Sequence, residues 1–310
     1  MTQITAAMVK ELRESTGAGM MDVKNALTEA QGDMEQAVVI LRKKGLAAAG
    51  KKAGRVTAEG TIVAHVEGKT GVLVEVNCET DFVGRNENFR NFATEIAKTI
   101  AQSKSTSVEE LLNENWPGSD EPVSQKVAEQ IGSIKENISV RRFARYDAPE
   151  HGTFGAYIHG GGKIGVLVEV VAATGKDAEA GEIARDIAMH IAAAEPRFLR
   201  REDVTEKDLD TEREIARDAA AKSGKPENIV EKMVEGAIAK FRKEMAFLSQ
   251  LFVMDNKTKI EDVVAAEAKK VGAPVQVAGF VRFQLGEGIE KATSDFAAEV
   301  AAASGVGKAA

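Results

Sequence analysis

The sequence predicts an α+β protein with a duplicated core, in which each copy is a β-hairpin followed by a helix. One observation is a valine-rich run at residues 71–76, too short and too β-branched for a helix. A second is repetition, because the same Gly-Val-Leu-Val-Glu-Val run returns at residues 165–170. A third is the helical spacing of the apolar residues that follow the first run from about Asn86. These residues are Phe89, Phe92, Ala93, Ile96 and Ile100.

Three short helices are expected in the N-terminal segment, residues 1–55. Each begins near a residue that can cap a helix or ends near a glycine. The expected boundaries are Thr5 to Gly17, about Asp22 to Gly32, and Asp33 to Gly45. Three helices around so small a core resemble a ubiquitin-associated domain. The turn between the first two carries Met20 and Met21; we expect one to fill the core and the other to be a flexible, exposed contact residue.

Further matches extend the repeat on both sides of the valine-rich run. Residues 60–61 and 152–153 are both Gly-Thr, and residues 96–101 resemble residues 187–192. We therefore expect two similar subdomains side by side. Between the copies, residues 123–140 show a helical pattern of apolar residues that leads into Asn-Ile-Ser-Val-Arg-Arg at 137–142, and residues 116–120 have the composition of a linker.

Residues 203–245 predict a protruding antiparallel helical hairpin. Gly224 is suited to ending the first helix and Pro226 to starting the second. The second helix carries two adjacent apolar rows, of which one can pack on the first helix and the other, with Met233, is left for a partner or the second subdomain. A period-two strand follows at residues 275–285, and then an amphipathic helix with Phe296. The expected divisions are residues 1–55 (ubiquitin-associated-like helical domain), 56–145 (core subdomain one), 146–202 with 246–290 (core subdomain two), 203–245 (coiled-coil hairpin) and 291–310 (C-terminal helical module).

The amino-acid composition and net charge argue against a membrane protein, a secreted protein and a protein that binds nucleic acid. The 310-residue chain is 44% apolar and 29% charged, which is typical of a globular protein of about two domains. No apolar run approaches the roughly 18 residues of a membrane span, and the first residues lack the pattern of a secretory signal. A net charge of −7 argues against binding nucleic acid through its phosphates. The single cysteine, Cys78, excludes an internal disulfide. Together with the lack of a membrane span and of a secretory signal, this leads us to expect no membrane association and a cytoplasmic location.

Two glycine-rich stretches imitate nucleotide-binding motifs. Residues 160–165 satisfy the dinucleotide pattern, but they join two predicted strands instead of opening a helix, so we expect a hairpin turn. Residues 45–51 lack the Ser or Thr that a phosphate loop requires next. The histidines share no metal-ligand spacing, and His190 and Cys78 are expected to be structural. We therefore expect no active site, no metal and no cofactor, which favours a binding function.

The segment at residues 77–83, where a strand gives way to a helix, has two interpretations. Phe82 can fold back as a staple onto the following helix, with Asp81 or Asn86 capping that helix. Alternatively, the scaffold presents Asp81 and Phe82 outward as a charge and a wedge that enter a partner.

The run Thr80-Asp81-Phe82-Val83, with Gly-Ala-Gly-Met-Met-Asp at residues 17–22, resembles the bacterial elongation factor Ts family, and the resemblance covers nearly the whole chain. It implies nucleotide exchange on the GTPase elongation factor Tu, without nucleotide binding by this chain. It also implies that Asp81 and Phe82 displace Mg²⁺ on the partner, with Thr80 and Val83 shaping the segment. The expected partner-binding residues are Arg13, Met20, Met21, Lys24, His159, Met233 and Phe296.

Two other hypotheses belong to different classes. A scaffold or chaperone would bind partners through the helical head and the coiled coil without changing nucleotide affinity. A nicotinamide-dependent enzyme would rest only on the glycine pattern at residues 160–165.

Overall fold

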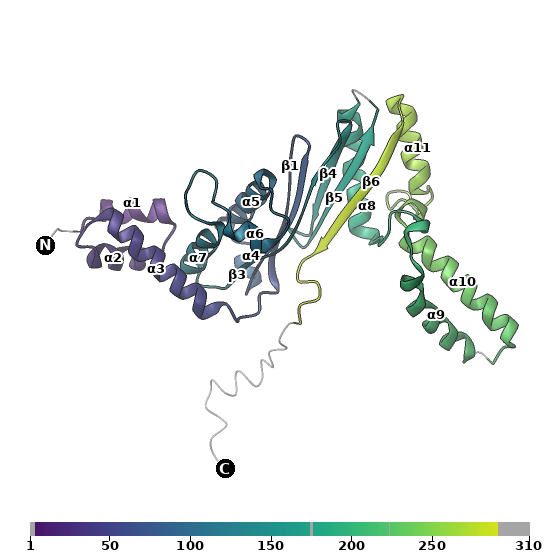
Figure 1. Cartoon of the computed structure of the whole chain (residues 1–310), viewed down its shortest axis with the longest axis horizontal. Helices are drawn as coiled ribbons and strands as arrows, with labels where there is room; N and C mark the ends of the chain where they lie inside the picture. Colours follow the sequence, from purple (N-terminus) through teal and green to yellow (C-terminus); the bar gives the residue numbers. More distant parts are fainter. Residues whose placement is uncertain (1–3, 174–175, 223, 291–310) are drawn as a thin grey trace, which may run out of the picture.

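The computed structural model describes residues 4–173, 176–222 and 224–290, and confirms the α+β class. Two three-stranded antiparallel sheets form the centre of an elongated molecule, with helices at both ends (Figure 1). The strands of the first sheet, in spatial order, are β1 (Glu59–Glu67), β2 (Thr70–Cys78) and β3 (Ile138–Asp147). Those of the second are β4 (Gly152–His159), β5 (Ile164–Ala172) and β6 (Val275–Gln284).

The two sheets stack on each other through apolar side chains, and helices cover their outer faces. The layer between the sheets is formed by Ile62, Leu73, Phe154, Leu167 and Phe283. On the first sheet, α5 (Glu87–Gln102), α6 (Val108–Asn113) and α7 (Val123–Ile134) bury the outer core. On the second, α8 (Asp177–Ala194), the 3₁₀ turn η2 (Phe247–Ser249) and α11 (Ile260–Val271) do so. Each central strand carries a register shift at the same repeat position, after Glu75 and after Glu169.

Three helices precede the first sheet: α1 (Ala6–Thr16), α2 (Met20–Glu29) and α3 (Met34–Lys52). Thr5 and Asp33 cap α1 and α3 as expected. The expected end of the third helix at Gly45 is wrong, because Gly45 lies inside α3 where that helix crosses α7. A Cβ on Gly132 of α7 would lie 2.9 Å from the Gly45 Cα, so the two glycines allow close packing of the helices.

The expected helical pattern over residues 123–140 is wrong in its last third. Helix α7 ends at Ile134, and Lys135 adopts a left-handed conformation with φ 69°. From Ile138 the chain is strand β3, because its backbone pairs with β2. Tertiary pairing therefore overrides the local apolar spacing.

The predicted helical hairpin is confirmed as α9 (Glu206–Ala221), which follows the 3₁₀ turn η1 (Arg201–Asp203), and α10 (Glu227–Met245). It projects from the second sheet, at the end of the molecule opposite α1 and α2 (Figure 1). The expected strand at residues 275–285 is confirmed as β6, whereas the expected helix with Phe296 lies outside the described residues. None of the helices in the described ranges is long and apolar enough to cross a membrane.

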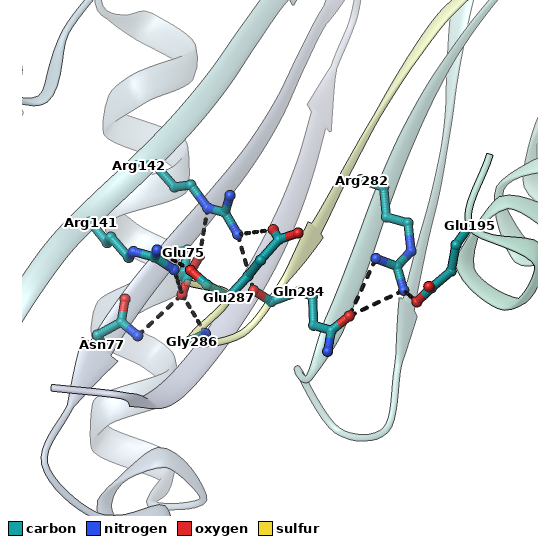
Figure 2. Close-up of polar contacts among 9 residues, drawn as sticks. All are labelled: Glu75, Asn77, Arg141, Arg142, Glu195, Arg282, Gln284, Gly286 and Glu287. Carbon is teal, nitrogen blue, oxygen red and sulfur yellow. Dashed lines mark hydrogen bonds and ion pairs between the residues drawn. The ribbon is translucent and has the colours of Figure 1, made fainter. Parts of the chain in front are cut away.

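A buried carboxylate joins the two sheets (Figure 2). Glu75 is fully buried and accepts hydrogen bonds from Arg141 (2.9 Å), Arg142 (2.7 Å) and the Gly286 amide (2.8 Å). Arg142 also bonds the Glu287 carboxylate at 3.0 Å, just beyond β6. The cluster therefore attaches the end of β6 to the first sheet.

Candidate functional site

Phe82 lies at the most exposed point of the β2–α5 connection. It belongs to the one-turn helix α4 (Asp81–Gly84), and 83% of its surface is exposed. Folding of Phe82 onto the following helix as a staple is therefore wrong, whereas the expected cap of that helix by Asn86 is confirmed. Asn86 already caps α5 by accepting from the amides of Asn88 and Phe89, and the Phe89 side chain fills the core beneath. The ring of Phe82 is therefore available to contact another protein.

Of the residues next to Phe82, Thr80 and Val83 attach the segment to the rest of the fold, whereas the Asp81 side chain is partly exposed. Thr80 caps α4, since its hydroxyl accepts from the Val83 amide at 3.4 Å, and Val83 packs on the core of the first sheet. Asp81 caps no helix; its carboxylate pairs with Arg85 at 2.9 Å. The segment thus presents an acid and an aromatic ring from a turn that is held at both ends.

Close backbone approaches support this turn from below. A Cβ on Gly84 would lie 2.8 Å from the Gly60 oxygen, so α4 rests directly on β1. Arg90 of α5 donates to the Gly84 oxygen at 3.1 Å and to the Gly161 oxygen at 3.0 Å. Gly161 belongs to the turn at residues 160–163 between β4 and β5, which confirms that the glycine-rich stretch joins two strands. The turn between β4 and β5 of the second sheet therefore supports α4 from below. We call α4, with its exposed Phe82, the tip.

A second group of predicted residues gathers on α1 and α2. Arg13, Met20, Met21 and Lys24 line one groove, and Asn88 of α5 also lines it. The expectation that one methionine fills the small core is wrong, because Met20 and Met21 are 57% and 64% exposed. The core is filled instead by Leu12, Val23, Ala26, Leu27, Ala30 and Ala37.

The remaining predicted contact residues lie apart from these two groups. His159 is exposed at the end of β4, where its Nδ1 lies 3.1 Å from the Tyr157 hydroxyl. Met233 is 37% exposed on α10, in the distant hairpin. Phe296 lies outside the described residues.

Cys78 and His190 are buried among structural contacts, as expected. Burial, with the charges of Glu136, Glu59 and Glu79, raises the pKa of the Cys78 thiol to about 12. Burial lowers the pKa of His190, whose Nε2 lies 2.9 Å from the Gln250 oxygen. Among the residues that the structure describes, no three His, Cys, Asp or Glu side chains gather as metal ligands would.

Sequence reasoning missed Arg90 and Glu136, the residues that secure the tip. Glu136 accepts three hydrogen bonds from Glu79 and Thr80, across an interval of more than fifty residues. Neither residue belongs to a periodic pattern, and the only signal was the position of Glu136 directly before the run at residues 137–142.

Comparison with known proteins gives the family. The family model described as Elongation factor TS matches residues 79–287, which is more than half of the chain and includes the exposed tip. The chain belongs to the elongation factor Ts family. Elongation factor Ts of Syntrophotalea carbinolica is 50% identical over 299 residues, covering 96% of this chain and 98% of the relative. The protein of the same name from Rhodospirillum centenum is 51% identical over 310 residues, covering 98% and 100%.

A third relative extends the similarity to another bacterium. Elongation factor Ts of Clostridium perfringens is 51% identical over 300 residues, covering 96% of this chain and 98% of the relative. Membership in the elongation factor Ts family therefore applies to the whole architecture, from the α1–α3 helices to the second sheet. It assigns the chain to protein biosynthesis as an elongation factor.

Proposed function

We propose that this chain is a guanine-nucleotide exchange factor that binds elongation factor Tu with GDP, displaces Mg²⁺ and promotes GDP release during elongation in the cytoplasm. The observation that carries the proposal is the exposed Phe82 beside Asp81 on a braced one-turn helix. Membership in the elongation factor Ts family supports the partner and the reaction.

The proposed mechanism requires no chemistry from this chain. Phe82 separates packed elements of the GTPase near its Mg²⁺ site, while Asp81 disturbs the hydrogen-bond network that holds the ion. Mg²⁺ neutralises much of the charge on the GDP phosphates, so its loss weakens nucleotide binding. Because coupling is reciprocal, a factor that binds the nucleotide-free GTPase more tightly than the loaded form must lower the affinity of the GTPase for GDP.

A second contact supplies affinity. In this proposal the groove with Arg13, Met20, Met21 and Lys24 binds another face of the GTPase. Exposed methionines adapt to an apolar surface, and the two cations complement acidic groups. His159, Met233 and Phe296 complete the proposed contact residues. The proposal includes no cofactor and no direct binding of nucleotide or nucleic acid.

The test is GDP release measured by stopped flow with a fluorescent GDP on elongation factor Tu. Phe82→Ala is expected to slow the maximal release rate at least about tenfold, equivalent to about 1.4 kcal/mol of barrier, with a normal fold. Asp81→Ala is expected to have a similar but smaller effect. Met254→Ala, which removes another exposed side chain far from the tip in sequence, is the matched control.

Unchanged release by Phe82→Ala, at normal affinity for the GTPase, would remove the wedge from the mechanism. Binding of the wild-type chain without any acceleration of release would instead indicate a scaffold or chaperone.

A further inference from the structure

The base of the exposed tip is held by one carboxylate from a distant part of the chain. Glu136 Oε2 accepts from the Glu79 amide at 3.1 Å and from the Thr80 amide at 3.0 Å, while Oε1 accepts from the Thr80 hydroxyl at 2.6 Å. These are charge-assisted hydrogen bonds, which are stronger than bonds between neutral groups. Both carboxylate oxygens are therefore used at the two residues directly before Asp81.

The neighbouring carboxylate completes the attachment in the opposite direction. Glu79 Oε1 accepts from the Asn137 amide at 2.6 Å, so two adjacent residues on each segment exchange bonds. Glu79 also pairs with Arg55 at 3.2 Å, and the Asn137 side chain donates to the Arg55 oxygen at 3.0 Å. We call this set (Arg55, Glu79, Thr80, Glu136 and Asn137) the tip clasp. It fixes the end of β2 to the α7–β3 junction and to the segment after α3.

Helix α4 needs this external support. A single turn has few hydrogen bonds of its own to offset the entropy of ordering its backbone. The Thr80 hydroxyl donates to Glu136 and accepts from the Val83 amide, so Glu136 orients the residue that caps the turn. Phe82 has no side-chain packing to hold it, since it is 83% exposed. The direction in which Phe82 points therefore depends on the clasp, together with the support that Arg90 and β1 give to Gly84.

We propose that Glu136 is a positioning residue for nucleotide exchange: by fixing Thr80, it keeps Asp81 and Phe82 in the geometry that enters the GTPase. This inference rests on the proposed function. Glu136 is not part of the wedge, and the proposed mechanism above assigns it no other role. Its loss affects the maximal rate of exchange more than the affinity, because most of the contact surface is left intact.

The first measurement uses the free full-length chain and needs no partner. In Glu136→Ala, amide hydrogen exchange in a peptide covering residues 79–84 is expected to quicken at least about tenfold, since two backbone amides lose their acceptor. Glu136→Gln keeps one acceptor oxygen and is expected to lie between wild type and Glu136→Ala. Glu109→Ala removes an exposed carboxylate on α6 and is the matched control. Unchanged exchange in both Glu136 variants would overturn the inference.

The second measurement is GDP release from elongation factor Tu over a range of factor concentrations. Glu136→Ala is expected to lower the maximal rate about fivefold and to change the half-saturating concentration less than about twofold, with Glu136→Gln restoring part of the rate. An unchanged maximal rate would overturn the inference, and so would a loss confined to half-saturation. If Glu136→Ala fails to fold, Glu136→Gln decides alone, with a loss of about twofold expected and no loss overturning the inference.

The two proposals fail in different ways. If Phe82→Ala slows release and Glu136→Ala does not, only the positioning role is wrong. If Phe82→Ala leaves release unchanged while the tip of free Glu136→Ala exchanges faster, the clasp orders the tip but the wedge function is wrong.

Discussion

Arg142 donates to the Glu75 carboxylate at 2.7 Å in the layer between the two sheets (Figure 2). The second copy of the repeat has the same glutamate, Glu169, at the same register shift. Its cross-strand neighbour on β6 is Gly279, where the first copy has Arg142 on β3. A duplicated sequence run thus carries a buried ion pair in one sheet, whereas in the other the glutamate faces a residue with no side chain.

This difference makes Glu75 and Glu169 a matched pair for stability measurements. Glu75→Ala is expected to lower the free energy of unfolding by about 2–4 kcal/mol, because it removes the buried carboxylate that accepts from Arg141, Arg142 and the Gly286 amide. Glu169→Ala is expected to cost less than about 1 kcal/mol. Chemical denaturation followed by circular dichroism measures both. Equal losses of unfolding free energy in the two variants would show that the hydrogen bonds from the arginines to Glu75 add nothing to stability.

The same pair has opposite pH dependence. Burial favours the protonated form of Glu75, but hydrogen bonds from Gly286, Arg141 and Arg142 outweigh it and hold the pKa below its ordinary value of 4.5. A depressed pKa stabilises the fold above the unfolded pKa, and this contribution is lost as pH falls through the folded value. The stability advantage of wild type over Glu75→Gln is therefore expected to be constant near neutral pH and to shrink below about pH 4.

For Glu169, burial raises the pKa, so the sign reverses. The contribution of this carboxyl is lost as pH rises through the raised folded pKa. Glu169→Gln is expected to be at least as stable as wild type at pH 7, with the difference vanishing below about pH 4.5. A wild type more stable than Glu169→Gln at pH 7 would contradict this expectation and would indicate a cationic partner for Glu169.

The close crossing of α3 and α7 predicts opposite effects of two glycine substitutions. Gly236→Ala, in α10, places a Cβ where no atom lies within 4 Å, so it is expected to stabilise by about 0.5–1 kcal/mol through helix propensity. Gly132→Ala gains the same propensity, but its Cβ would lie 2.9 Å from the Gly45 Cα. We expect a net loss of about 1 kcal/mol or more, measured by thermal unfolding. Equal stabilisation by both would show that the crossing is loose.

The Cys78 thiol is expected to be unreactive in the folded chain. Burial raises its pKa to about 12, and the side chain is fully buried, so almost no accessible thiolate forms at pH 8. Labelling with Ellman's reagent is expected to proceed only as fast as the chain opens, and to reach completion in denaturant. Complete labelling within seconds under native conditions would contradict this burial.

Periodicity predicted the elements whose contacts are local. The hairpin of β1 and β2, the helix after Asn86 and the α9–α10 hairpin all have the spacing that their burial requires. The errors arose where long-range packing decides. Gly45 is compatible with a helix end by itself, but the helix continues through it and packs there against Gly132. Residues 138–140 form a strand because β2 pairs with them.

For the site, the sequence indicated the location of the tip but not its direction. Phe82 was compatible with folding inward or pointing outward, and the choice depends on bonds from Glu136 and Arg90, which come from other segments. The Arg141-Arg142 run was visible, but its partner Glu75 lies on another strand, and pairing across strands cannot be read from composition.

The continuous α3 helix has a consequence for how a partner is engaged. Arg42 pairs with Glu121 and Glu129, and Lys135 pairs with Asp22, so the methionine groove is held to the core by ion pairs as well as by the glycine crossing. The groove and Phe82 are therefore kept at a set separation. In the proposed function, once one of them touches the GTPase, the other is held at high local concentration, so the two contacts together act as a bivalent ligand whose fixed spacing must match that of the partner.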